Sequence, residues 1–196
     1  MHIAIDIDDV TVSITQGLID FHNSLHKTEF TIEDHSDFAL HTIWNITPEE
    51  AMEEVYAFYH SPAMDGLPPM DGAISGINEL RGNHKISFVT SRPQFLEVKT
   101  KKWLEKHFPG VNLPVYLTNQ FTPDTHKKVT KAEICKQIKA ELMIEDSPAN
   151  VQDCVSEHIP VLLFERQWNK EIKDTKYITR VRNWKEILER VALIAE

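Results

Sequence analysis

Residues 1–10 read MHIAIDIDDV, and this stretch decides how the rest of the sequence is interpreted. The apolar run at positions 3–5 is typical of a buried strand, yet it leads into three carboxylates, Asp6, Asp8 and Asp9. Side chains alternate along a strand, so Asp6 and Asp8 point the same way if the strand geometry persists that far. Two carboxylates so close together repel each other unless a proton or a cation lies between them. The stretch therefore indicates a strand that ends in an acidic cluster with a positive partner.

Four later runs share the character of this first strand. The five runs are short and largely apolar, as buried parallel strands are, and lie at 2–7, 86–90, 115–118, 142–145 and 161–164. Helical patterns separate the later runs, and an amphipathic stripe near the C-terminus predicts a last helix that docks on the sheet. The alternation predicts an α/β fold, a Rossmann-like three-layer sandwich with a five-stranded parallel sheet.

One long segment breaks the alternation of strands and helices. Between the first two predicted strands a helix is expected near 15–26, and the sequence TPEE at 47–50 has the threonine, proline and glutamate of a helix start. Because a structureless loop of this length is uncommon in a compact domain, we expect an inserted helical cap at 15–68. The core domain would then comprise 1–14 and 69–196.

Composition excludes several classes of protein. The chain has 196 residues and a formal net charge of −9, which disfavours a nucleic-acid polymer as partner. It contains no apolar stretch of the roughly 18–20 residues that a membrane span needs. The two cysteines, Cys135 and Cys154, lack CxxC spacing, and the chain opens with a strand rather than a secretory signal. We therefore expect a cytoplasmic protein with reduced thiols; whether it forms a homodimer stays open.

Polar residues gather where the predicted strands end. The set consists of Asp6, Asp8, Thr90, Ser91, Glu145 and Asp146, with Lys131 in the helix before the fourth strand. In open parallel sheets, chemistry takes place beyond the carboxyl ends of the strands, so these side chains should meet. Carboxylate oxygens suit Mg²⁺, whereas hydroxyls and a lysine suit a phosphate group. The pattern predicts a combined magnesium and phosphate site.

Four segments carry a resemblance to a known family. DIDDVT, FVTS, KAEICKQ and MIEDS resemble, in this order and at these strand ends, the four motifs of haloacid-dehalogenase-type phosphatases. The resemblance covers about 1–14 and 70–166 and says little about 15–68. KTKKWLEKHFP and the segment from IEDSPANV to PVLLFERQWN look like the 5′(3′)-deoxyribonucleotidase branch and its bacterial relatives. That branch usually has glycine after its second aspartate, where this chain has Asp9.

The resemblance implies a two-step phosphoryl transfer. Asp6 would attack phosphorus and form an aspartyl-phosphate, while Asp8 would protonate the leaving oxygen and then accept a proton from water. It also implies a set of Mg²⁺ ligands, namely Asp6, the Asp8 carbonyl, Asp146 and Glu145, the last of which could instead support the site from behind.

The resemblance also implies which groups contact the substrate. Thr90, with Ser91, and Lys131 would hold the phosphoryl oxygens. Arg92 would contact either the phosphate or solvent, and the sequence favours neither. In the cap, Phe38 and Trp44 either stack on a flat base or form the core of the subdomain.

The expected substrate is therefore a small phosphorylated metabolite, and a nucleoside monophosphate fits best. A sugar or organic-acid phosphate and a noncatalytic phosphometabolite sensor are the alternatives. A signalling receiver is rejected because VYLTNQ places no acid at the end of the third strand. His22 and His26 have metal-ligand spacing, but with ten histidines and no HExxH pattern, chance is the better explanation.

Overall fold

The computed structural model describes residues 1–36, 39–110, 113–120 and 128–195. Within them, six parallel strands form one sheet in the order β3-β2-β1-β4-β5-β6. The strands are β1 (His2–Ile5), β2 (Lys85–Thr90), β3 (Val115–Leu117), β4 (Leu142–Glu145), β5 (Val161–Phe164) and β6 (Ile178–Val181). This order reverses at β1, and the crevice between β1 and β4 is where such sheets bind ligands.

The α/β class is confirmed, but the predicted number of strands is wrong. The sixth strand, β6, has the sequence ITRV and pairs only with β5, at the edge of the sheet. Its central residues, Thr179 and Arg180, are partly exposed, so the strand lacks the continuous apolar run that marks a strand buried on both faces.

Helices cover both faces of the sheet. On one face, Ile3, Ile5 and Phe88 belong to a core that also contains residues of α5 (Ala73–Asn83), α6 (Glu97–His107) and α9 (Trp184–Ala195). On the other face, a second core includes residues of α7 (Lys131–Ile138) and α8 (Pro148–Ser156). The alternation of Ile3, Ala4 and Ile5 between these two cores reflects the pleat of the strand.

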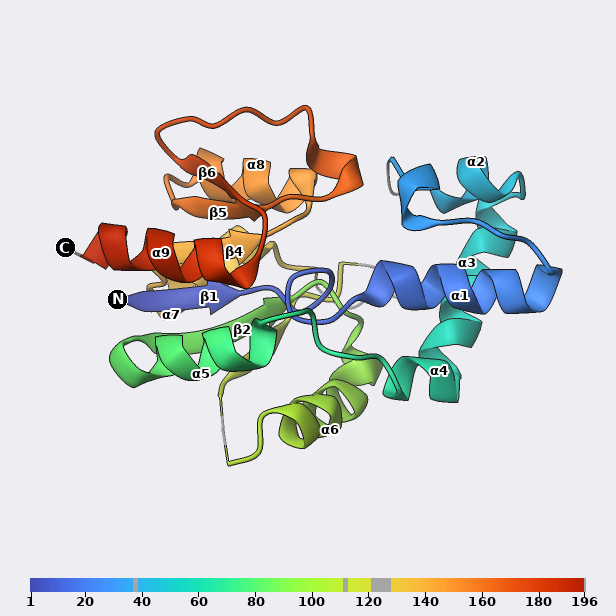
Figure 1. Ribbon diagram of the computed structural model, residues 1–196, viewed down its shortest axis with the longest axis horizontal. Helices are drawn as coiled ribbons and strands as arrows, with labels where there is room; N and C mark the ends of the chain where they lie inside the picture. The colour runs from blue at the N-terminus through green and yellow to red at the C-terminus, as the bar shows by residue number, and fades with distance from the viewer. Residues whose placement is uncertain (37–38, 111–112, 121–127, 196) are drawn as a thin grey trace.

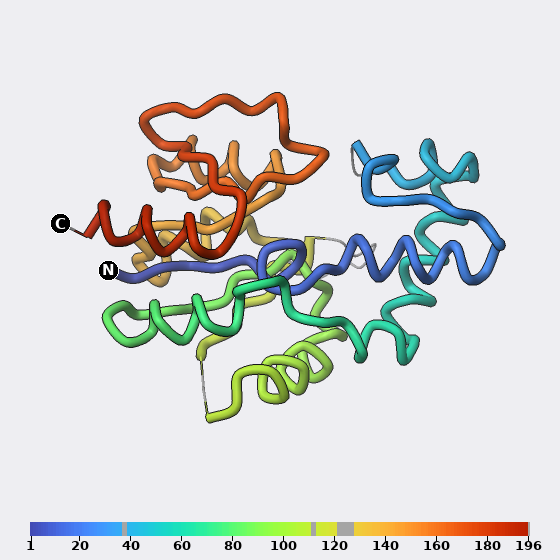
Figure 2. The backbone as a smooth tube through the Cα atoms, viewed as in Figure 1, coloured from blue at the N-terminus to red at the C-terminus, as the bar shows by residue number. Residues whose placement is uncertain are grey.

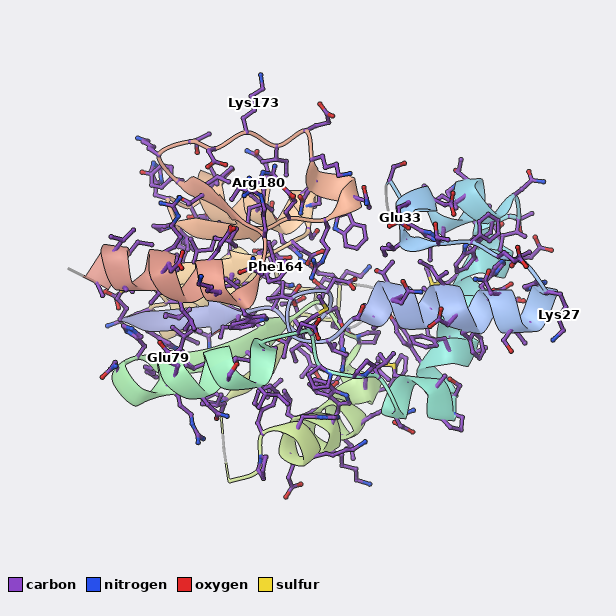
Figure 3. All side chains as sticks on the ribbon, in the orientation of Figure 1. Lys27, Glu33, Glu79, Phe164, Lys173 and Arg180 are labelled. Carbon is purple, nitrogen blue, oxygen red and sulfur yellow. The ribbon has the colours of Figure 1, made fainter. Side chains whose placement is uncertain are left out.

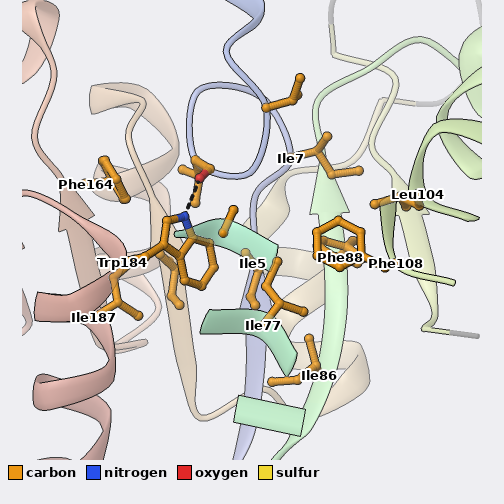
Figure 4. Packing of buried hydrophobic residues seen from close by; sticks show 14 of the residues in the cluster. Ile5, Ile7, Ile77, Ile86, Phe88, Leu104, Phe108, Phe164, Trp184 and Ile187 are labelled. Atoms are coloured by element: carbon orange, nitrogen blue, oxygen red, sulfur yellow. Dashed lines mark hydrogen bonds between the residues drawn. The ribbon is translucent and has the colours of Figure 1, made fainter. Parts of the chain in front are cut away.

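Trp184 connects α9 to the rest of the first core. Its indole nitrogen donates a hydrogen bond to the Val10 carbonyl at 3.0 Å, drawn as a dashed line in Figure 4. A Cβ atom on Gly76 would lie 2.4 Å from the Trp184 ring, so only glycine lets α5 approach this closely. The contact holds both helices beside the loop that follows β1.

The segment after β1 forms a separate group of helices, at the right of Figure 1. It contains α1 (Ile14–His26), the 3₁₀ turn η1 (Ile32–Asp34), α2 (Leu40–Trp44), α3 (Pro48–His60) and α4 (Pro62–Asp65), and we call α1 to α4 the cap. The helix start predicted at TPEE is confirmed: Thr47 and Glu50 form a reciprocal capping box with Pro48 at the first position.

The ends of the chain and the last long loop complete the fold. Both termini lie at the end of the molecule away from the cap (Figure 2). The loop after β5, which contains the 3₁₀ turn η3 (Gln167–Asn169), is bound by Arg180, whose guanidinium donates to the carbonyls of Asn169 and Ile172. Figure 3 shows Lys173 on the outside of this loop. None of the described helices is long and apolar enough to cross a membrane.

Candidate active site

Asp6 lies at the carboxyl end of β1 and is almost completely buried. The strand itself ends at Ile5, two residues earlier than predicted, but the Asp6 amide still donates to the Ile144 carbonyl at 3.0 Å. The Asp6 carboxylate is held through Oδ1, which accepts from the Ile7 amide at 2.7 Å and lies 2.7 Å from Lys131 Nζ. The central strand therefore fixes the orientation of this carboxylate.

Lys131 is the first residue of α7, directly after its capping residue Thr130, and only 1% of its surface is exposed. Its ammonium group lies between two acids, 2.7 Å from Asp6 Oδ1 and 2.8 Å from Glu145 Oε2. Burial by itself would lower the pKa of Lys131, but these two carboxylates raise it above its ordinary value. Lys131 is therefore a permanent cation in the site.

Glu145 ends β4, and both of its carboxylate oxygens are engaged. Oε2 binds Lys131, and Oε1 accepts from the amides of Asp146 at 3.0 Å and Ser147 at 2.8 Å. The side chain is fully buried. Through these contacts Glu145 orients Lys131 and the turn into α8.

Asp6, Glu145 and Asp146 form a group whose ligand oxygens lie within 4.8 Å of one another. Burial, followed by repulsion from Glu145, raises the pKa of both Asp6 and Asp146 well above the ordinary aspartate value. Lys131 offsets only part of this negative charge. A divalent cation would relieve the repulsion, and an all-oxygen donor set is the type that Mg²⁺ prefers, so the residues fit this ion.

Asp8 belongs to a different charge pair. Arg92, itself buried, donates from Nη2 to Asp8 Oδ1 at 2.6 Å and from Nε to both carboxylate oxygens at 3.0 Å. Thr90 Oγ1 donates to Asp8 Oδ2 at 3.4 Å and accepts from the Arg92 amide at 3.2 Å. Residues at and just after the end of β2 therefore hold the Asp8 side chain in a fixed orientation.

Ser91 follows Thr90, and its hydroxyl contacts Gln120, which follows β3, and Asn150 of α8. Its hydroxyl donates to Gln120 Oε1 at 2.9 Å and accepts from Asn150 Nδ2 at 3.5 Å. Ser91 lines the cavity described below, whereas Thr90 is fully buried behind it. The two hydroxyls predicted to act together thus occupy different positions.

Asp9 has a left-handed backbone, with φ of 56°. Asp and Asn tolerate this conformation better than most residues other than glycine, so an aspartate can occupy this position in place of glycine. The Asp9 carboxylate accepts from the Thr15 amide and hydroxyl in the first turn of α1, while Arg166 donates to its carbonyl. Burial raises the pKa of Asp9 to about 6, although these Thr15 contacts oppose the shift.

Two residues that bind Asp146 were not predicted. Trp168 Nε1 donates to Asp146 Oδ2 at 2.8 Å, and Asn169 Nδ2 donates to the Asp146 carbonyl at 2.8 Å. Both lie on η3, in the loop beyond the carboxyl end of β5. Their position after β5 is the feature of the sequence that could have indicated a role in the site, because the same edge of the sheet carries the other site residues.

A cavity of about 260 Å³ lies between the cap and the core. Its polar wall comes from the core and includes Asp6, Asp8, Arg92, Lys131 and Asp146. Its apolar wall comes from the cap and consists of Ile14, Leu18, Leu40, Met52, Val55, Phe58 and Tyr59. The arrangement can hold a phosphate on one side and an apolar group on the other.

The structure does not bring Trp44 to this cavity. Trp44 is 5% exposed, stacks on His22 with 4.0 Å between ring centroids, and donates from Nε1 to His35 Nε2 at 3.1 Å. Its large ring is needed inside the small cap core, so it is not available to a substrate. Phe38 lies outside the described residues. Phe58 and Tyr59 are the aromatic side chains that the described part of the cap places at the cavity.

Comparisons with known proteins show the family to which the chain belongs. The family model described as 5′ nucleotidase, deoxy (Pyrimidine), cytosolic type C protein matches residues 1–196. A nucleotidase of Clostridium acetobutylicum is 31% identical over 188 residues, 95% of this chain and 91% of the relative.

Solved structures support the fold. The haloacid dehalogenase-like hydrolase SP0104 from Streptococcus pneumoniae superposes with a TM-score of 0.67 at 13% identity, covering 97% of both chains. YfnB from Bacillus subtilis, a HAD-hydrolase described as bound to magnesium, has a TM-score of 0.60 at 14% identity and the same coverage of 97% of each chain. The chain therefore belongs to the deoxy (pyrimidine) type C 5′-nucleotidase family and is a nucleotidase-like phosphatase of the haloacid dehalogenase superfamily.

Proposed function

We propose that the protein is a Mg²⁺-dependent phosphatase that hydrolyses a nucleoside or deoxynucleoside monophosphate through an aspartyl-phosphate on Asp6. One observation carries the proposal: Asp6 with its lysine and Asp8 with its arginine line one cavity whose opposite wall is apolar. We further propose that 15–68 acts as the substrate-selecting cap on a catalytic core made of 1–14 and 69–196.

The first step is the attack of Asp6 on phosphorus. Both described contacts to this carboxylate, from Lys131 and the Ile7 amide, are made by Oδ1, so we assign Oδ2 as the nucleophile. The new P–O bond forms as the bond to the leaving alkoxide breaks. Lys131 remains charged throughout and stabilises the phosphoryl oxygens together with the Ser91 hydroxyl.

Asp8 transfers the proton in both steps. A bidentate arginine stabilises an ionised carboxylate, so the pair with Arg92 suits Asp8 as the base that deprotonates water in the second step. For the first step Asp8 must carry a proton to the leaving oxygen. We propose that Arg92 turns toward the phosphate when substrate enters, which weakens its contact with Asp8.

The carboxylates of Asp6 and Asp146, with the Asp8 carbonyl, would hold Mg²⁺, and Glu145 would support them through Lys131 and the Asp146 amide. When bound, Mg²⁺ supplies positive charge that neutralises the phosphoryl oxygens. Trp168 keeps Asp146 in place through its hydrogen bond to Oδ2.

The cap wall favours a nucleotide over a sugar phosphate. Leu18, Leu40 and Val55 offer no hydrogen bonds to the hydroxyls of a sugar, whereas a flat base can bury its faces against them. Tyr59 adds an aromatic ring at this wall, and burial raises the pKa of its hydroxyl, which keeps it neutral. We propose that Tyr59 stacks on the base, and that the protein acts on free nucleotides in the cytoplasm.

The test is phosphate release from a panel of nucleoside monophosphates, sugar phosphates and organic-acid phosphates, with Mg²⁺ and with excess chelator. We expect turnover of nucleotides that disappears with the chelator and with Asp6→Asn. Turnover that persists in excess chelator would exclude the metal role. Binding of nucleotides without any phosphate release by the wild-type protein would make it a sensor rather than an enzyme.

A further inference from the structure

We infer that the cap contains a second metal site, formed by His22, His26 and Glu54, which takes a transition-metal cation such as Zn²⁺ and is separate from the magnesium site. The histidines lie on α1 and the glutamate on α3, and one ligand atom from each falls within 4.8 Å of the others. The spacing of the two histidines alone left chance as the better explanation. The structure adds a third ligand from a different helix.

The Glu54 carboxylate already contacts both histidines. Glu54 Oε2 lies 2.7 Å from His22 Nδ1, and Glu54 Oε1 lies 2.6 Å from His26 Nε2. Residues four apart on a helix share a face, so the two rings lie side by side with 4.5 Å between their centroids, and Glu54 of α3 contacts a nitrogen of each. Around Zn²⁺, with bonds of about 2.0–2.2 Å, the ligand atoms would lie about 3.3 Å apart. The glutamate therefore needs to withdraw by less than about 1 Å to admit the ion.

The type of ligand selects the class of metal. Imidazole nitrogen suits Zn²⁺ and similar cations, whereas the Asp6 and Asp146 oxygens suit Mg²⁺. Each imidazole would bind through the nitrogen that now faces Glu54 and carry its proton on the other nitrogen. Two histidines and one glutamate leave a fourth position for water.

The surroundings hold one ligand rigid and leave the other accessible. The His22 side chain is 3% exposed, and its ring is stacked on Trp44. The side chain of His26 is 46% exposed, so a metal can enter from solvent on that side. His35 is excluded as a further ligand, since its Nδ1 contacts the Thr31 carbonyl and its Nε2 accepts from Trp44.

A metal at this position would link α1 and α3, two of the cap helices that contribute to the cavity wall. Leu18 lies one turn before His22 on α1, and Val55 follows Glu54 on α3. With a rise of about 1.5 Å per residue, His26 lies about 12 Å along the helix from Leu18. The ion would therefore fix α1 relative to α3 through residues that do not themselves line the cavity.

The experiment measures Zn²⁺ binding by calorimetry, with excess Mg²⁺ present to occupy the carboxylate site. We expect one Zn²⁺ per chain and a melting temperature raised by about 5 °C or more at one hundred times Kd. His26→Gln and Glu54→Gln should each weaken zinc binding by at least about 100-fold, because even indirect partners of a metal are worth about 10–100-fold. Both variants keep side chains of similar size.

Matched controls exist on the same helix. Glu53→Gln and His60→Gln change exposed neighbours that lie outside the cluster, and zinc affinity should stay unchanged. Melting temperatures measured with chelator show whether each variant is folded. Equal zinc affinity in wild type and His26→Gln would overturn the site, and so would the absence of Zn²⁺ binding tighter than millimolar. Co²⁺ provides a second readout, because its visible absorption should lose its nitrogen-ligand character in His26→Gln.

Discussion

The guanidinium of Arg92 binds the Asp8 carboxylate in a fork, with Nη2 2.6 Å from Oδ1 and Nε 3.0 Å from both oxygens. Asp8 comes from the loop after β1 and Arg92 from the end of β2, so the pair joins two neighbouring strands at the cavity. Arg92 Nη1 is also bound to Thr100 Oγ1 at 2.9 Å, which anchors the arginine to α6. The orientation of the proposed proton donor therefore depends on a residue outside its own loop.

Arg92→Gln should lower kcat/KM by about 10²–10³, the usual effect of removing one positioned donor at a reacting centre. The substitution takes away both the partner of Asp8 and a cation for the phosphate. Thr100→Val is the control, because it removes only the Nη1 contact and should lower activity far less. The measurement is kcat/KM of both variants and the wild type with one nucleotide as substrate. An unchanged kcat/KM in Arg92→Gln would mean that the pair has no part in the reaction.

Substituting the two aspartates Asp6 and Asp8 should produce different kinetic defects. Asp6→Asn removes the nucleophile and should abolish both turnover and the trapped phosphoenzyme. Asp8→Asn keeps the nucleophile, so an aryl phosphate with a good leaving group should still phosphorylate Asp6, while a nucleotide should lose about 10²–10⁴-fold in rate. Rapid-quench measurement of the phosphoenzyme separates the two. Activity of Asp6→Asn within about tenfold of wild type would contradict the covalent route.

Trp168→Phe should weaken the binding of Mg²⁺ without unfolding the protein. The phenyl ring keeps most of the packing but cannot donate to Asp146 Oδ2, and partners of this kind are worth about 10–100-fold in metal affinity. Activity titrated against Mg²⁺ gives the shift. Trp103→Phe is the matched control, since its indole donates to the Leu67 carbonyl at 2.8 Å, away from the carboxylates. If both variants require the same Mg²⁺ concentration as wild type, the Trp168 contact is only structural.

The sequence was sufficient to predict five of the six strands because their signal is local. The run at 142–144, for example, is apolar throughout, as expected for a parallel strand buried on both faces. The sixth strand needed information from elsewhere, since Ile178–Val181 is defined by pairing with β5 rather than by its own composition.

The candidate site also contains residues that the sequence predicts and residues that it does not. Asp6 and Asp146 could be predicted because each directly follows a recognisable strand, and the fold brings such ends together. Lys131 could be predicted as a lysine in the helix before β4, and the fold places it against Asp6. Trp168 was missed: its place after β5 indicates only the edge of the sheet, whereas its contact depends on how the loop after β5 folds back over Asp146. Tyr59 could not be predicted, because its position depends on the packing of α3 against the core, where Lys99 Nζ donates to the Tyr59 carbonyl at 2.9 Å.

The cap offers the sharpest separation between packing and recognition, through two aromatic residues. Trp44 is enclosed with His22 and His35, so Trp44→Ala should lower the free energy of unfolding by about 3–5 kcal/mol and affect all substrates alike. Tyr59 lines the cavity, so Tyr59→Leu, which keeps an apolar side chain, should act on the nucleotide itself.

For Tyr59→Leu we expect KM for a nucleoside monophosphate to rise about 5- to 150-fold, since stacking on a base is worth about 1–3 kcal/mol. Hydrolysis of a small aryl phosphate, which lacks the base, should change little. The ratio of kcat/KM for the two substrates, measured beside the melting temperature, reports recognition separately from folding. Equal losses on both substrates would show that Tyr59 orients the neighbouring Asp8 and Arg92 instead, and would leave the nucleotide without an aromatic contact in the described part of the cap.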